Sequence, residues 1–131
     1  MPFARLTLIP APTSDTAQLL AAHLTAIVAH DLGKQHELTS VLVETPGVPQ
    51  WTIGANRREV AAHLEVCVTA GTNSEEEKRA FVGNAMLLLQ RTLPMLATAT
   101  YIVVKELPAT NWGFDGQTQA DRARKRAMNP A

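Results

Sequence analysis

The chain has 131 residues, 46% hydrophobic and 18% charged, which is the composition of one ordinary globular domain. Twelve basic residues balance twelve acidic ones, so no net field favours nucleic acid or an anionic membrane. A single cysteine, Cys67, excludes an internal disulfide and a multi-thiolate metal site. The sequence shows neither a signal peptide nor an apolar run near the roughly 20 residues that span a bilayer, so we expect a cytoplasmic protein.

The first half of the sequence predicts a strand, a helix and a second strand. Residues 3–9 alternate in polarity and are rich in β-formers, which is typical of a strand. Residues 13–15 (Thr-Ser-Asp) offer N-caps for a helix that ends near Gly33, a fitting C-cap. Residues 38–44 (LTSVLVE) predict the second strand, and residues 47–56 a loop.

The second half predicts the same order. Residues 62–69 (AHLEVCVT) form the expected strand. Ser74, with Glu77 three residues later, indicates a capping box at the start of a helix that ends near Leu93. Residues 100–106 (TYIVVKE) predict the last strand, followed by a loop and a polar tail.

An internal repeat connects the two halves. The run VLVETP, ending at Pro46, matches VVKELP, ending at Pro108, and QWTIGAN matches NWGFDGQ at a similar offset. The sequence therefore predicts one domain with a pseudo-repeat of 2–58 and 59–117 and a C-terminal tail, 118–131. Because parallel strands need a right-handed crossover, we expect an α+β fold in which two β-α-β units form a four-stranded sheet with both helices on one face.

The other face of this sheet is expected to be mixed in polarity. Leu64, Val66 and Val68 would face the helices, whereas Glu65 and Cys67 would face away. Subunits assembling around an axis would bury that second face, which motivates an oligomer. A monomer with one wet face is the alternative.

The N-terminus carries the most informative residue. A Met-Pro start predicts removal of Met1, which leaves Pro2 with a free secondary amine. Burial would lower the pKa of that amine, because it disfavours the charged form, and a general base near neutral pH would result. The alternative is that the Met-Pro start has no functional meaning.

Together, Pro2, the two β-α-β units, LTSV at residues 38–41 and the paired Trp-x-[Ile/Phe]-Gly-like closures resemble the tautomerase superfamily. The resemblance covers Pro2 to about Gln117. It implies a cofactor-independent isomerase without a metal, with Pro2 as the catalytic base. It also implies a homotrimer with pockets for a small-molecule substrate at the subunit interfaces.

The same resemblance implies further site residues. Lys34 would meet the substrate oxyanion or carboxylate, and Tyr101 would come from a neighbouring subunit. Asn111, Trp112 and Phe114 would wall the pocket. The alternatives are that Lys34 is a helix-end cation and that Tyr101 is a core aromatic.

Arginine is missing where members of this superfamily use it to hold carboxylates. The matching positions are Thr13, Leu42, Gly71 and Asn73, which puts dicarboxylate substrates in doubt. Arg5, Arg57 or Arg58 would be substitutes. A C-terminal basic cluster reads as a solvated tail or the last turn of a helix, with docking on a partner subunit as a third interpretation: Arg122, Arg124, Lys125 and Arg126.

Three functions follow from these residues. The first is keto–enol tautomerisation of a small 2-oxo acid by Pro2. The second is a decarboxylase, hydratase or dehalogenase that uses protonated Pro2 as an acid, with Glu65 or Glu106 as the partner carboxylate. The third is a protein of the same fold that only binds or assembles, in which Met1 is retained.

Overall fold

A computed structural model describes residues 2–129, so the predicted removal of Met1 concerns a residue outside the described range. The elements of the two halves follow in chain order: β1 (Phe3–Ile9), α1 (Ser14–Leu32), η1 (His36–Leu38), β2 (Ser40–Glu44), β3 (Thr52–Ile53), β4 (Asn56–Arg57), β5 (Ala61–Thr69), α2 (Glu75–Thr92) and β6 (Ile102–Leu107). The chain then ends with β7 (Gly113–Phe114), β8 (Gln117–Thr118) and α3 (Gln119–Met128).

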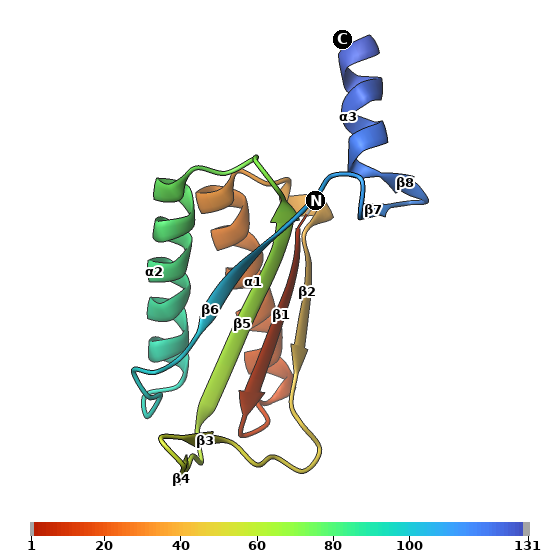
Figure 1. Cartoon of the computed structure of the whole chain (residues 1–131). Coiled ribbons are helices and arrows are strands. Elements are labelled where there is room, and N and C mark those ends of the chain that lie inside the picture. Colours follow the sequence, from red (N-terminus) through yellow and green to blue (C-terminus); the bar gives the residue numbers. More distant parts are fainter. Residues whose placement is uncertain (1, 130–131) are drawn as a thin grey trace.

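The main sheet has four strands in the order β2-β1-β5-β6. β1 runs parallel to β2, and β5 runs parallel to β6, whereas the central pair β1 and β5 is antiparallel. Each parallel pair is joined by one helix, and both helices cover the same face of the sheet (Figure 1). The predicted pair of β-α-β units with two helices on one face is therefore confirmed.

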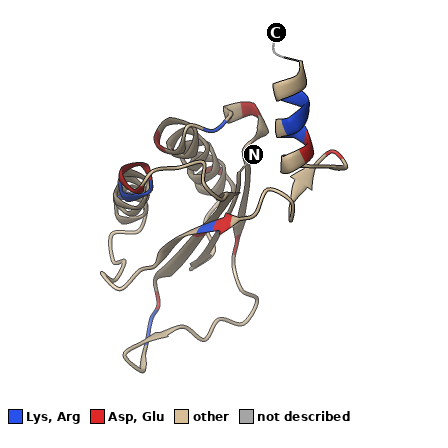
Figure 2. Ribbon diagram, turned by 45° about the horizontal axis from the view of Figure 1, so that its top comes forward, with Lys and Arg blue, Asp and Glu red and all other residues tan. Residues whose placement is uncertain are grey.

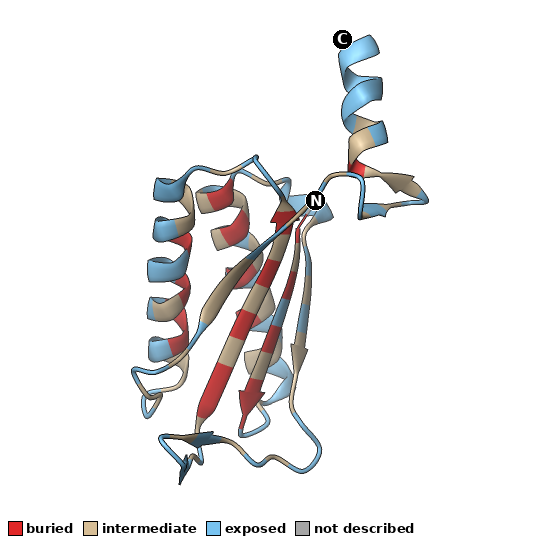
Figure 3. Ribbon diagram, in the orientation of Figure 1, coloured by how far each residue is buried: buried red, intermediate tan, exposed pale blue. Residues whose placement is uncertain are grey.

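The core lies between that face and the helices. Alternate residues of β1 and β5 are fully buried, among them Leu6, Leu64 and Val66, as the banding of the two central strands shows (Figure 3). Leu24 of α1 and Phe81 of α2 pack against them. Each such side chain contributes about 1.5–3 kcal/mol through its removal from water.

The helix ends are fixed by local hydrogen bonds. The Thr13 hydroxyl accepts the Thr16 amide at 3.1 Å and caps α1. Ser74 and Glu77 form the predicted capping box at α2, with reciprocal bonds of 3.1 and 2.7 Å. Gly33 ends α1 in the left-handed region with φ 65°, so the chain turns sharply and Lys34 leaves the helix axis.

The opposite face of the sheet is half-exposed and mixed in polarity, as expected, with Cys67 beside charged side chains. Glu65 accepts hydrogen bonds from His63 at 2.9 Å and from Lys105 at 2.6 Å. The bond from Lys105, followed by that from His63, lowers the pKa of the Glu65 carboxyl. Arg5 pairs with Glu44 at 3.6 Å on the same face.

The hairpin β7–β8 and α3 form a C-terminal arm, residues 113–128, that projects from the two-layer body (Figure 1). Backbone bonds attach it: the Gln119 amide donates to the Trp112 carbonyl and the Ala120 amide to the Ala109 carbonyl, each at 2.9 Å. The C-terminal basic cluster thus lies in a helix, with Lys125 and Arg126 in its last turn (Figure 2). Within residues 2–129, no helix is both long and apolar enough to cross a membrane.

Candidate functional site

The N-terminus lies at one end of the sheet, beside the start of β2 and the end of β5. Phe3 pairs with Ser40 on one side and with Cys67 on the other. The Ser40 amide donates to the Pro2 carbonyl at 3.2 Å. Pro2 is buried there.

A cavity of about 280 Å³ opens at this end, between the body and the C-terminal arm. We call it the Lys34 cleft, and its lining residues come from the end of α1, the ends of the strands and the arm: Gly33, Lys34, Gln35, Leu38, Thr69, Thr72, Ala109, Phe114, Gln119, Ala123 and Arg126. Pro2 lies at the same end of the sheet but is not among the lining residues. Leu38 and Thr69, each two residues along the chain from a partner of Phe3, form parts of the cleft wall.

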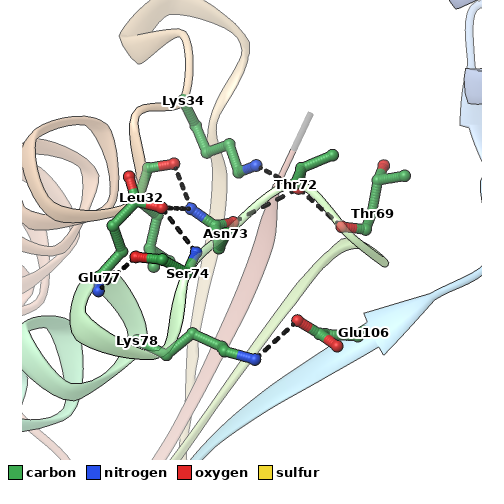
Figure 4. Close-up of polar contacts among 9 residues, drawn as sticks. All are labelled: Leu32, Lys34, Thr69, Thr72, Asn73, Ser74, Glu77, Lys78 and Glu106. Atoms are coloured by element: carbon green, nitrogen blue, oxygen red, sulfur yellow. Dashed lines mark hydrogen bonds and ion pairs between the residues drawn. The ribbon is translucent and has the colours of Figure 1, made fainter.

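Lys34 is held in the cleft by a short polar chain (Figure 4). Its Nζ donates to Thr72 Oγ1 at 2.8 Å, and Thr72 Oγ1 donates to the Thr69 carbonyl at 2.6 Å. Burial lowers the pKa of Lys34, and the Glu77 carboxylate opposes that lowering. The side chain is thus a partly dehydrated cation, which binds anions more strongly than a fully hydrated one.

Asn73 ties the C-terminus of α1 to the N-terminus of α2. Its Nδ2 donates to the Leu32 carbonyl at 2.8 Å and approaches Glu77 Oε1 at 3.5 Å (Figure 4). The Leu32 carbonyl is one of the last acceptors of α1, which have no partner within the helix. The base of the Lys34 cleft is therefore fixed by both helices.

The C-terminal arm supplies the opposite wall. Trp112 Nε1 donates to Thr69 Oγ1 at 3.2 Å. Arg122 packs over the Phe114 ring at 3.6 Å from its centroid and donates to the Phe114 carbonyl at 3.0 Å. A Cβ on Gly113 would collide with the Gln117 carbonyl oxygen, so the hairpin requires glycine there. Phe114 is therefore held firmly at the cleft.

The remaining predicted site residues lie elsewhere in the chain. Asn111 and Trp112 line a neighbouring cavity of about 270 Å³ where the chain enters the arm. Tyr101 is at the opposite end of the sheet, where its carbonyl accepts the Leu64 amide at 3.2 Å. Its side chain is 70% exposed and lines a separate cavity with Trp51. One chain brings Lys34 and Phe114 together but leaves Tyr101 far from both.

The three substitute arginines lie outside the Lys34 cleft. Arg5 pairs with Glu44, and Arg57 pairs with Glu59 at 3.7 Å. Arg58 donates to the Met95 carbonyl at 3.4 Å. The arginine that does line the cleft is Arg126.

Gln119 lines the cleft although no sequence pattern indicated it. It is 8% exposed, and its Nε2 is buried without a hydrogen-bond partner among the described residues. Within residues 2–129, no three His, Cys, Asp or Glu side chains are grouped as metal ligands would be.

No protein-family model matches the chain, and no curated protein matches its sequence. Solved structures match its fold closely. A native fused 4-OT shares 22% identity with a TM-score of 0.81, covering 93% of this chain and 99% of the other. The macrophage migration inhibitory factor homologue of Prochlorococcus marinus shares 22% identity with a TM-score of 0.75, covering 88% and 97%. The chain has the fold of the fused 4-OT and of the migration inhibitory factor homologue.

A second migration inhibitory factor-like protein, from Entamoeba histolytica, shares 20% identity with a TM-score of 0.76, covering 89% of this chain and 97% of the other. Other fused 4-OT structures, at 16–18% identity, are symmetric or asymmetric trimers. The sequence resemblance therefore identified the correct fold. At these identities the likeness concerns the fold alone, and activity must be argued from the site.

Proposed function

We propose that the protein is a cofactor-independent tautomerase that interconverts the keto and enol forms of a small 2-oxo acid, with Pro2 as the base after removal of Met1. The observation that carries this proposal is the burial of Pro2 at the end of the sheet where the Lys34 cleft opens. A desolvated amine next to an anion-binding group is what removal of a proton from the carbon beside a keto group requires. We propose a cytoplasmic location, consistent with the lone free Cys67.

The proposed reaction moves one proton without net change. In the enol-to-keto direction, the Pro2 nitrogen accepts the enol O–H proton, and the resulting enolate places negative charge on its oxygen. Protonated Pro2 then delivers that proton to the carbon at position 3, which restores the free amine. Lys34 would bind the substrate carboxylate or stabilise the enolate oxygen.

We propose a homotrimer as the active assembly. The half-exposed outer face of the sheet offers a surface for it, and Tyr101 is exposed at the end of the sheet away from Lys34. A neighbouring subunit would bring its Tyr101 to the Lys34 cleft. The fused 4-OT trimers support this arrangement.

The decarboxylase, hydratase or dehalogenase alternative needs a carboxylate beside Pro2. Glu65 is bonded to His63 and Lys105 on the outer sheet face, and Glu106 pairs with Lys78 at 3.0 Å. Neither lines the Lys34 cleft. Tautomerisation, which needs a single base, is therefore the better-supported reaction.

The test is intact mass of the untagged protein, followed by phenylpyruvate enol–keto conversion. We expect Met1 to be absent and Pro2→Ala to lower kcat by about 100-fold or more, the usual contribution of a positioned base. Pro46→Ala, at an exposed proline after β2, is the matched control and keeps wild-type activity. Retained Met1, or equal activity of the Pro2→Ala protein, would favour a binding or assembly role.

A further inference from the structure

We propose that α3 supplies carboxylate-binding groups of the Lys34 cleft: the Gln119 amide and the Arg126 guanidinium act with Lys34 on a monocarboxylate ligand. This inference takes its substrate class, a small 2-oxo acid, from the function proposed above. It assigns the role of the missing superfamily arginines to a C-terminal helix.

One face of α3 points at the cleft. Gln119, Ala123 and Arg126 all line it, and their spacing of four and three residues places them on the same side of a helix. Arg124 and Lys125 do not line the cleft and are exposed. The small side chain of Ala123 leaves room between the amide and the guanidinium.

Gln119 is the observation that points to a ligand. Among the described residues it is the polar residue that is buried, 8% exposed, and its Nε2 donates to none of their atoms. A buried donor without an acceptor costs free energy, and natural structures rarely retain one without a reason. A carboxylate oxygen in the cleft would accept from Nε2 and remove that cost.

The charge of the cleft selects an anion. Lys34 and Arg126 are its charged members, and its lining within the described residues contains no carboxylate. Leu38, Phe114 and Ala109 provide apolar wall for the rest of the molecule. The cleft therefore fits a small acid with one carboxylate and an apolar body.

The arm is built to hold these groups in place. The Thr118 hydroxyl caps α3 by accepting the Asp121 amide at 3.0 Å. The backbone amide of Gln119 donates to the Trp112 carbonyl, and Arg122 binds α3 to Phe114. Gln119 is thus the first residue of a capped helix whose start is anchored beside the cleft.

The test is calorimetric titration of the full-length protein with 3-phenylpropanoate, which lacks the 2-oxo group and is not turned over, and with neutral 3-phenylpropanamide. We expect the acid to bind at least about tenfold more tightly than the amide. Gln119→Leu should weaken acid binding about tenfold, because a hydrogen bond to a charged group is lost. Arg126→Gln should weaken it about threefold, because this residue is exposed.

Arg124→Gln is the matched control, with the same loss of charge on the same helix outside the cleft, and should bind the acid as the wild type does. Equal acid binding by wild type and the Arg126→Gln and Gln119→Leu variants overturns the proposal. If circular dichroism shows that Gln119→Leu is unfolded, Arg126→Gln against Arg124→Gln decides alone. If acid binding depends on α3 while Pro2→Ala keeps full turnover, the anion site stands and the assignment of the base fails.

Discussion

The two ends of the main sheet are built from equivalent parts of a repeat but carry different chemistry. Because β1 and β5 are antiparallel, the start of each half lies at the opposite end. At one end lie Pro2, just before β1, and Lys34, which follows α1. At the other end β5 continues from β4, and Met95, 75% exposed, lies in the loop after α2, near the position that matches Lys34. The proposed base, the amine of Pro2, has no counterpart at the second end, so we place the proposed catalysis at the first end alone.

The turns that precede the two helices also differ in their capacity to form hydrogen bonds. Before α1 the turn contains Pro10 and Pro12, which have no amide hydrogen. Before α2 it contains Thr72 and Asn73, which bond to Lys34 and to the end of α1. The two β-α-β units have similar frames, and these polar contacts distinguish the one that carries the proposed binding site.

The largest expected effect comes from making the first end resemble the second. Lys34→Met should raise KM for phenylpyruvate about 10- to 100-fold, because a charged hydrogen bond to the substrate is lost. The reciprocal Met95→Lys should leave KM unchanged, because no N-terminal amine lies at that end. Steady-state kinetics of both variants measure this. An unchanged KM in Lys34→Met would remove Lys34 from the proposed site.

The pH dependence of ligand affinity provides a second test of the role of Lys34. Burial lowers the pKa of Lys34 below its ordinary value of 10.5, so the side chain loses its proton at a lower pH than a free lysine. Affinity for 3-phenylpropanoate should therefore fall on the alkaline side, starting below pH 10.5, as pH rises through that lowered pKa. In Lys34→Met this fall should be absent, since Arg126, the other cation of the cleft, keeps its charge at these pH values. Titrations between neutral pH and the pH at which the protein unfolds measure it.

The two helix caps offer a smaller contrast, in stability. Bonds from Ser74, first from its backbone amide, lower the pKa of Glu77, whereas Thr16 holds the matching position in α1. A carboxyl group whose pKa is lower in the folded protein than in the unfolded chain stabilises the fold at pH values above its unfolded pKa. This stabilisation is lost as the pH falls through the folded pKa. Glu77→Gln should therefore reduce the free energy of unfolding at pH 7 but not at pH 3. Urea unfolding at both pH values tests this, with Glu76→Gln as the control; an equal loss at both would contradict it.

Long periodic segments were predictable, because burial imposes a pattern on them. β1 spans residues 3–9 as expected, and α1 ends where Gly33 indicated. β2 begins at Ser40 and not at Leu38, since residues 36–38 form a short 3-10 turn. The sequence did not distinguish the helix α3 from a polar tail, because the apolar face of QADRARKRAM consists of alanines and not of large side chains. Its helicity rests on local propensity and the Thr118 cap.

The candidate site was predictable where the resemblance reached it. Lys34 and Phe114 do line one cleft, whereas Asn111 and Tyr101 line others. Gln119 could not have been found, since a polar residue in a polar segment gives no sign that packing will bury it. The two hairpins were predicted as loops because strands of two residues show no alternation.

Substitutions in the turns of these two hairpins should have the smallest effect, a small change in the free energy of unfolding. In β3–β4 the central residues Gly54 and Ala55 have φ of 58° and 65°, and in β7–β8 Asp115 and Gly116 have 51° and 77°, so both turns need two left-handed residues.

Alanine at a left-handed position has a steric cost, because its Cβ crowds the backbone. Glycine avoids this cost but loses more conformational entropy on folding, and the steric cost is slightly the larger of the two. Ala55→Gly should therefore raise the free energy of unfolding by about 0.5 kcal/mol. Gly116→Ala should lower it by about 1 kcal/mol. Urea unfolding measures both, and a destabilised Ala55→Gly protein would contradict the account of strain. Because only β7–β8 leads into α3, Gly116→Ala should also weaken 3-phenylpropanoate binding, whereas Ala55→Gly should leave binding unchanged.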